Sequence, residues 1–214
     1  MKTLTKAMPL ILTLLGGVGM WFLAIRLIIR LPSLPQQIIA SVCFLIYCYW
    51  LNWESHISVN ELNKSHIHKD YHTMELAALA KLTTLAAAFL GGTTINPYLA
   101  IPGIIIMVWG IRLRQYAVIA LGRQYSHRLR IPEGTVCEDG PYNRIRHPAY
   151  MGTFAAHIGF VMVFFNFWSA LSVSILWSSA VLLRTIIEDR MLMGLADYKT
   201  YSERVKYKLI KGIW

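Results

Sequence analysis

Residues 149–183 read AYMGTFAAHIGFVMVFFNFWSALSVSILWSSAVLL, a run of 35 residues without Asp, Glu, Lys or Arg. A helix needs about 20 mostly apolar residues to cross the hydrocarbon layer of a bilayer, so this run is too long for one crossing. Asn166 lies near its middle and is followed by Phe167 and Trp168, which favours an interfacial bend between two antiparallel helices. The run therefore predicts a hairpin that crosses a membrane twice.

The remainder of the chain has the same character. Of its 214 residues, 56% are hydrophobic and only 15% are charged, a composition that excludes an ordinary water-soluble globule. Further uncharged runs occupy residues 7–25, 31–53 and 82–111, and the last is divided by a turn-forming segment that includes Gly91, Gly92 and Pro97. We predict an all-α, polytopic transmembrane bundle of five to six spans, near residues 8–29, 35–53, 73–91, 97–119, 149–165 and 168–187.

The basic residues predict an orientation for this bundle. Seven of the 21 Lys and Arg residues fall between residues 112 and 146, and seven more between residues 184 and 211. By the positive-inside rule, both termini and a C-terminal functional region face the cytoplasm. Arg26 and Arg30 disagree with this orientation, because a first span that starts inside carries them to the outer side.

The net charge of +10 borders hydrophobic spans, so it indicates membrane lipids as partners and not nucleic acid. We infer no obligate protein partner. The three cysteines, Cys43, Cys48 and Cys137, are expected to be free thiols because none is placed for an extracellular disulfide.

Polar chemistry concentrates in two segments. The first, residues 121–152, reads LGRQYSHRLRIPEGTVCEDGPYNRIRHPAYMG and is interrupted by glycines and prolines, which predicts an ordered loop that enters the membrane at Pro148. Ionisable groups are costly beside hydrocarbon, so its basic turn at Arg146 and His147 is a candidate functional site. On their own, these two residues fit a simple anchor to lipid phosphates better than a functional site.

The second segment follows the last span. Arg184 and Glu188 are four residues apart and share one helical face, whereas Asp189 lies about 100° around the helix. The pair suits the two ends of a zwitterionic ligand, although an interfacial ion pair that ends a helix has the same spacing. Tyr198 and Tyr201 are expected to fold back over the loop and exclude water from it.

The histidines between the second and third spans are a weaker candidate for chemistry. They are His56, His66, His68 and His72. The spacing of His68 and His72 is one that metal ligands use, but no cysteine or close carboxylate accompanies them. We expect a solvated interfacial loop and no bound metal.

Taken together, the motifs resemble those of the isoprenylcysteine carboxyl methyltransferase family. The resemblance covers about residues 97–214 and is carried by RIRHPAYMG at residues 144–152, the acidic pair Glu188 and Asp189, and LGRQYS at residues 121–126. It divides the chain into N-terminal transmembrane helices, residues 1–96, and a methyltransferase core, residues 97–214.

The resemblance implies an integral membrane enzyme that transfers a methyl group from S-adenosylmethionine to a lipophilic acceptor. Its C-terminal region, on the cytoplasmic side, is the implied cofactor-binding region. Glu188 matches the family's first acidic residue, which binds the cofactor, and Arg184 matches the arginine that faces the acceptor; we take these two as the catalytic residues. The other implied cofactor contacts are His127, Gly134, Thr135, Val136, Cys137, Tyr142, Arg146, His147, Pro148, Ala149 and Tyr150.

The chain also departs from the family's pattern. Asp189 stands where the family has glutamate, Lys211 stands where a proline usually precedes the glycine, and the first spans match nothing known in the family. The acceptor therefore stays open between a carboxylate, an amine and a thiol. Two other functional classes also stay open: an NADPH-dependent membrane sterol or steroid reductase, and a membrane scaffold or transporter.

Overall fold

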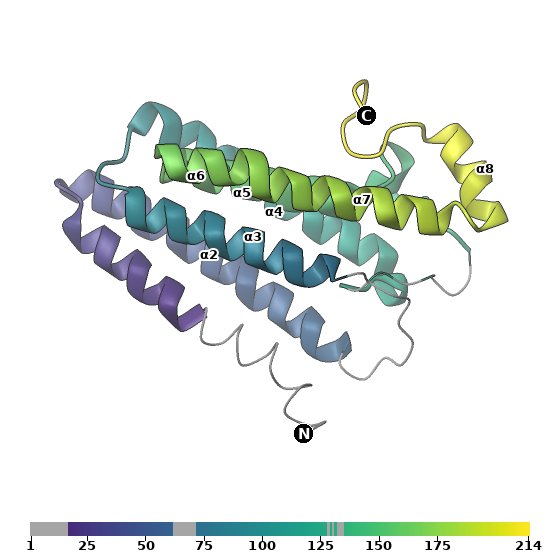
Figure 1. Ribbon diagram of the computed structural model, residues 1–214, viewed down its shortest axis with the longest axis horizontal. Coiled ribbons are helices and arrows are strands. Elements are labelled where there is room, and N and C mark those ends of the chain that lie inside the picture. Colours follow the sequence, from purple (N-terminus) through teal and green to yellow (C-terminus); the bar gives the residue numbers. More distant parts are fainter. Residues whose placement is uncertain (1–16, 62–71, 128, 130, 132–134) are drawn as a thin grey trace.

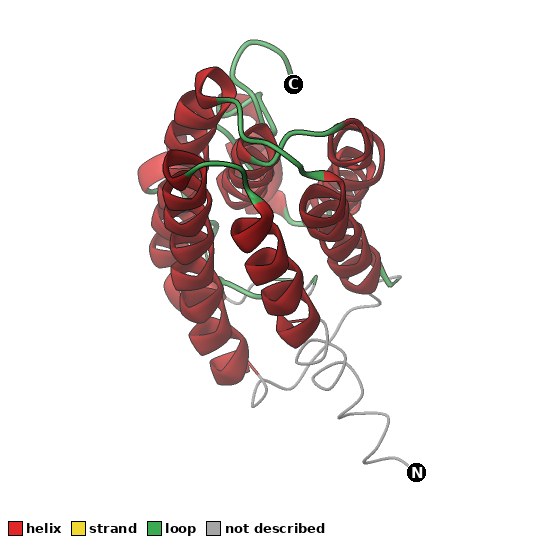
Figure 2. Ribbon diagram, turned by 90° about the vertical axis from the view of Figure 1, so that its left-hand side faces the viewer, coloured by secondary structure: helices red, strands yellow, loops and turns green. Residues whose placement is uncertain are grey.

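The computed structural model describes residues 17–61, 72–127, 129, 131 and 135–214, and every regular element in these residues is helical. Figures 1 and 2 show the long helices lying side by side along the longest axis of the molecule. Residues 17–30 form a helix. The next elements are α2 (Leu34–Glu61), α3 (Thr73–Gly91), α4 (Pro97–Leu121) and the short helix η1 (Gly122–Gln124).

The C-terminal half begins with a short helix in the loop and ends with a helix outside the bundle. A single continuous rod, α6 with η3 and α7, follows α5, and its middle element η3 is a π-helical turn. The elements are η2 (Gly140–Asn143), α5 (Pro148–Val163), α6 (Phe167–Ser172), η3 (Val173–Trp177), α7 (Ser178–Leu192) and α8 (Ala196–Arg204).

Within the described residues, four helical stretches are long and apolar enough to cross a membrane. They are Leu34–Ile57, Thr73–Gly91, Pro97–Gln124 and Phe167–Leu192. α5 is apolar but has only 16 residues, about 24 Å at 1.5 Å per residue, which is shorter than the hydrocarbon layer of about 30 Å. The predicted span at residues 8–29 lies partly outside the described residues. With α5 too short by this measure, the structure supports four spans of the predicted five to six.

Both predicted turns are confirmed. α3 ends at Gly91 and α4 begins at Pro97, where the Asn96 side chain accepts a hydrogen bond from the backbone N–H of Tyr98. Asn166 lies between α5 and α6 and forms a reciprocal cap with Ser169. Its amide Nδ2 also donates to the carbonyl of Ala87 in α3 at 3.0 Å, so the bend is fastened to a third helix.

Glycines bring α4 and α5 into the closest contact of the bundle. A Cβ atom on Gly110 would lie 2.5 Å from the backbone nitrogen of Ala156, and one on Gly152 would lie 2.5 Å from that of Arg114. Gly103 and Gly159 face each other in the same way. Small residues let helix backbones approach closely in membranes, where packing replaces the hydrophobic effect as the force between helices. This contact fixes α5, which carries the basic turn at its start.

Gly110→Ala should therefore destabilise the protein, by roughly 1–3 kcal/mol, because the new methyl group meets backbone that cannot move aside. Thermal unfolding in detergent measures the effect. Gly19→Ala is the matched control, since a Cβ there meets nothing within 4 Å and alanine favours helix. Equal unfolding midpoints for the two variants would contradict this account of the contact.

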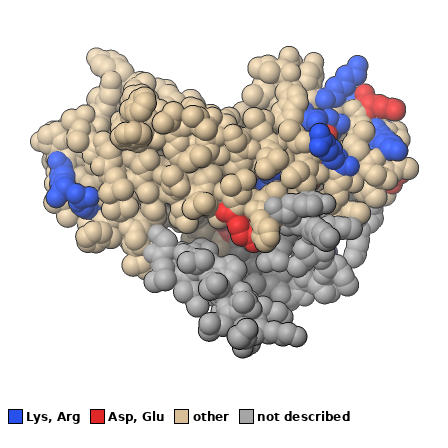
Figure 3. Space-filling model, in the orientation of Figure 1, with Lys and Arg blue, Asp and Glu red and all other residues tan. Residues whose placement is uncertain are grey.

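The candidate site lies at one end of the bundle. Figure 1 shows α8, the C-terminal residues and the end of α4 at this end, and the links between α3 and α4 and between α5 and α6 at the other. On the face drawn in Figure 3, most of the visible Lys and Arg atoms gather toward the two ends, and only a small basic patch and an acidic patch lie between them. The exposed Arg26 and Arg30 precede the link to α2, which lies at the end away from α8. Their disagreement with the positive-inside rule therefore persists, and the cytoplasmic orientation stays a prediction.

Candidate active site

The Arg-His-Pro turn is held by the C-terminal segment. Pro148 occupies the first turn of α5, where its missing N–H costs nothing. The backbone N–H of Arg146 donates to the carbonyl of Tyr207 at 2.9 Å, and that of His147 donates to the carbonyl of Lys208 at 2.8 Å. The Tyr201 hydroxyl donates to the carbonyl of Tyr142 at 2.7 Å. The expected return of the tail over the loop is thus confirmed.

Asp189 is the charged centre of this arrangement. Its buried carboxylate accepts a hydrogen bond from the Tyr198 hydroxyl at 2.9 Å and lies 3.2 Å from His147 Nε2. Lys208 Nζ is 3.2 Å away, and Arg146 Nε is 3.4 Å away in an ion pair that lacks hydrogen-bond geometry. A carboxylate with this many partners is fully engaged within the protein, so Asp189 joins the turn, α7, α8 and the tail.

Glu188 has a different environment from its neighbour. Its side chain is 26% exposed, and Oε2 lies 3.9 Å from His147 Nδ1. The carboxylate also interacts with the hydroxyl of Tyr150, whose ring stacks on the His147 ring at 5.9 Å between centroids. Of the two adjacent acids, Asp189 is committed to the fold and Glu188 retains a carboxylate that a ligand can reach.

Arg184 lies one turn before Glu188 and is 6% exposed. Its Nε donates to the Tyr150 hydroxyl at 2.9 Å, and its Nη1 donates to Thr73 Oγ1 of α3 at 3.2 Å. Nη2 donates to the backbone carbonyl of His127. The Tyr150 hydroxyl therefore contacts both Arg184 and Glu188, which brings the basic turn and the last span into one site.

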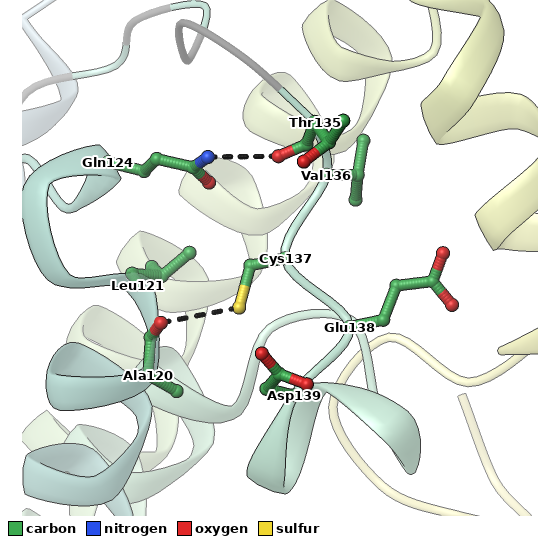
Figure 4. Close-up of a pocket in the computed structure, with 8 residues that line it drawn as sticks. All are labelled: Ala120, Leu121, Gln124, Thr135, Val136, Cys137, Glu138 and Asp139. Carbon is green, nitrogen blue, oxygen red and sulfur yellow. Dashed lines mark hydrogen bonds between the residues drawn. The ribbon is translucent and has the colours of Figure 1, made fainter.

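An open pocket of about 410 Å³ lies beside this site, between the end of α4 and the loop (Figure 4). Gln124 Nε2 donates to the Thr135 carbonyl at 2.9 Å and Cys137 Sγ donates to the Ala120 carbonyl at 3.4 Å, so both walls are tied together. The pocket is lined by Ala120, Leu121, Gln124, Thr135, Val136, Cys137, Glu138 and Asp139.

Tyr142 connects the pocket wall with the basic turn. It is buried against Ala117 and Ala149, and Cys137 packs against the same cluster. Burial, and next the Glu188 carboxylate, raise the pKa of Tyr142 well above its usual value, so its hydroxyl remains protonated. Burial likewise raises the pKa of the Cys137 thiol, which makes that cysteine a poor nucleophile.

Comparison with known families agrees with these positions. Residues 103–194 match the family model described as the isoprenylcysteine carboxyl methyltransferase (ICMT) family. Over this segment, which is less than half of the chain, the sequence is similar to the ICMT family. The match begins within α4 and includes the Arg-His-Pro turn, Arg184 and both acids, and it ends before α8. None of the curated proteins compared with the chain matches it.

The match to the ICMT family, together with the apolar helices, supports a membrane methyltransferase. The family's members use S-adenosylmethionine as methyl donor. The geometry brings together most positions that the resemblance singles out: Thr135, Val136 and Cys137 at the pocket, Tyr142 and residues 146–150 in the turn, and Arg184 with Glu188 on α7. Gly134 lies outside the described residues.

His127 lies with Arg184 and not in the pocket wall. Its Nδ1 is 3.1 Å from the Tyr125 hydroxyl, and its Nε2 is 3.9 Å from Glu54 of α2. Burial, and next the positive charge of Arg114, lower the pKa of His127 to about 4, so its imidazole is neutral near pH 7. Whether it touches a cofactor remains a prediction, but its contacts lie on the Arg184 side of the site.

Sequence reasoning missed the polar groups that α2 and α4 supply. Glu54 and Arg114 form a buried ion pair beside Tyr125, and Lys81 lies nearby over the Trp50 ring. One signal was present, since Arg114 and Lys81 are charged residues within or beside apolar runs, where such residues are usually functional. Among the described residues no group of three potential ligands could hold a metal ion, and His66 and His68 lie outside them.

Replacement of Asp189 by asparagine should loosen the turn. Asparagine keeps the shape but removes the negative charge from Arg146, His147 and Lys208, so the free energy of unfolding should fall by about 2–4 kcal/mol. The thermal unfolding midpoint in detergent reports this loss. Glu203→Gln, at an exposed position on α8, removes the same charge and should leave the midpoint unchanged.

Proposed function

We propose that the protein transfers a methyl group from S-adenosylmethionine to a lipophilic acceptor at the membrane surface. One observation carries the proposal: the Tyr150 hydroxyl, from the family's turn, contacts both Arg184 and the accessible Glu188. A cation and an anion thus meet at one point, beside a pocket and at the end of apolar helices. We propose that the protein is integral to the membrane and that the end of the bundle with the candidate site faces the cytoplasm.

The residues at the pocket suit the methyl donor. A volume of about 410 Å³ falls within the range of small-molecule sites, roughly 300–1,000 Å³. Glu188 can accept hydrogen bonds from an ammonium group, and Glu138 or Asp139 at the pocket can accept from ribose hydroxyls. The loop backbone at Thr135 and Val136 borders the same space. We assign donor binding to this set, with His147 and Tyr150 completing the side toward α7.

S-adenosylmethionine supplies a methyl group already activated by its sulfonium, so the protein's main task is alignment. Arg184 offers a planar fork of N–H donors that matches a carboxylate. We therefore propose a lipophilic carboxylate, of the isoprenylcysteine kind, as the acceptor. Such an acceptor needs no general base, whereas an amine or thiol would require Glu188 or His147 to take a proton.

The tail limits access of water to this site. Tyr198, Tyr201 and Val205 form a buried cluster into which Val136 of the pocket wall packs. Arg204 of α8 pairs with Glu138 at the pocket. Because α8 and the tail cover the loop from the end of the bundle, the acceptor is proposed to enter sideways from the bilayer.

Titration of the purified protein with S-adenosylhomocysteine and with NADPH tests the donor. Saturable thermal stabilisation by S-adenosylhomocysteine, and not by NADPH, is the expected result, because ligand binding to the folded state raises its stability. Stabilisation by NADPH alone would point to a reductase, and no response to either ligand would point to a scaffold. Radiolabelled S-adenosylmethionine with a membrane lipid extract would then identify the acceptor.

Arg184 and Glu188 of α7 should show different effects in a mutational test. Glu188→Gln should abolish detectable binding of S-adenosylhomocysteine in calorimetry, because the ligand loses its anionic partner. Arg184→Gln should leave that affinity within about threefold. It should reduce the rate of methyl transfer by about 100-fold, the loss expected when a reactant is misaligned. Wild-type cofactor affinity in Glu188→Gln would refute the assignment.

A further inference from the structure

Glu54 is a largely buried carboxylate that has no role in the proposed function as described so far. It lies near the end of α2, within an apolar span and outside the segment that matches the family. Its side chain is 13% exposed. Charged groups in such positions are costly and persist where they serve a site, so its contacts call for an explanation.

Arg114 of α4 binds this carboxylate in a fork. Arg114 Nη2 donates to Glu54 Oε2 at 2.8 Å, and Arg114 Nε donates to Oε1. The indole N–H of Trp50, one turn earlier on α2, donates to the same Oε1 at 2.9 Å. Two parallel charge-assisted bonds and an indole donor fix both the position and the plane of the Arg114 guanidinium.

From this fixed guanidinium, contacts extend toward both parts of the candidate site. Arg114 Nη2 donates to the Tyr125 hydroxyl at 2.7 Å, and Nη1 lies 3.4 Å from the carbonyl of Ala149 in the first turn of α5. The Tyr125 hydroxyl is 3.1 Å from His127 Nδ1. The backbone carbonyl of His127 then accepts from Arg184. A short series of hydrogen bonds therefore joins α2 to the proposed acceptor arginine.

We propose that Glu54 is a positioning residue for methyl transfer: through Arg114, Tyr125 and His127 it holds Arg184 in the orientation that the acceptor requires. The inference rests on the proposed function, because it takes Arg184 as the residue that meets the acceptor. It gives the N-terminal spans, which carry no family signature, a part in the reaction. Glu54 itself touches neither donor nor acceptor in this arrangement.

The charge balance explains why a carboxylate is needed at this position. Lys81 lies over the Trp50 ring and, with Arg114, adds positive charge beside Glu54, whereas His127 is neutral near pH 7. Without Glu54, Arg114 would lose two of its hydrogen bonds, and its guanidinium would shift toward its other acceptors, the Ala149 carbonyl and the Tyr125 hydroxyl. Either shift would move residues 125–127, whose His127 carbonyl accepts a hydrogen bond from Arg184.

The test compares Glu54→Gln with wild type, with Arg114→Gln and with the double variant, in the full chain reconstituted in lipid nanodiscs. Glu75→Gln is the matched control, since Glu75 lies on α3 with its side chain 56% exposed. Calorimetry gives the affinity for S-adenosylhomocysteine. Methylation of N-acetyl-S-farnesylcysteine, a lipophilic carboxylate, gives kcat and KM for the acceptor.

Glu54→Gln should keep its affinity for S-adenosylhomocysteine within about twofold and lose about tenfold to 100-fold in kcat/KM for the acceptor. The double variant should be no worse than Arg114→Gln alone, since residues that act in series are not additive. Unchanged acceptor kinetics in Glu54→Gln, equal losses for both substrates, or additive losses in the double variant would each overturn the proposal. Wild-type protein that binds no S-adenosylhomocysteine would instead overturn the proposed function, and this inference with it.

Glu54→Asp is a second test variant, for the case in which Glu54→Gln does not fold. If Glu54→Gln does not yield monodisperse helical protein, Glu54→Asp keeps the charge but withdraws the carboxylate from Arg114 by one methylene group. It should raise the acceptor KM and leave the affinity for S-adenosylhomocysteine unchanged. Wild-type acceptor kinetics in Glu54→Asp would then count against the proposal.

Discussion

The site depends on the pairing of charges where hydrocarbon meets water. An unpaired ion is costly in such a place, so each buried ion of this protein requires a partner. Asp189 meets that requirement for Arg146 and lies beside Lys208 and His147, and Glu54 meets it for Arg114. Two carboxylates on different helices thus each stabilise a group of basic side chains, and Arg184 and Tyr150 contact residues of both groups.

This arrangement gives the two adjacent acids of α7 separate roles. Asp189 is surrounded by donors from α8, the tail and the turn, and it acts as a structural centre. Glu188, one residue earlier, turns by about 100° and keeps an accessible carboxylate. A sequence shows only two neighbouring acids, and their environments decide which one can meet a ligand.

The fold was largely predictable from apolar run lengths and from a few turn-forming residues. Gly91, Pro97 and Asn166 marked the helix ends because glycine, proline and a capping asparagine act locally. The Arg-His-Pro turn and its convergence with α7 were predictable through the family pattern. The Glu54–Arg114 pair was not, because its residues are 60 positions apart and only packing brings them together. The glycine contact between α4 and α5 was hidden for the same reason, since spacing alone does not reveal which helices are neighbours.

The backbone bonds from Arg146 and His147 to Tyr207 and Lys208 also bear on biosynthesis. A ribosome makes the turn about 60 residues before it makes the carbonyls that receive those bonds. During that interval the nascent turn must be solvated or held by lipid headgroups, although α4 and α5 can already pair. The candidate site is therefore completed only after the tail is made, and a stop codon shortly before residue 207 would leave a helical bundle with an unfinished site.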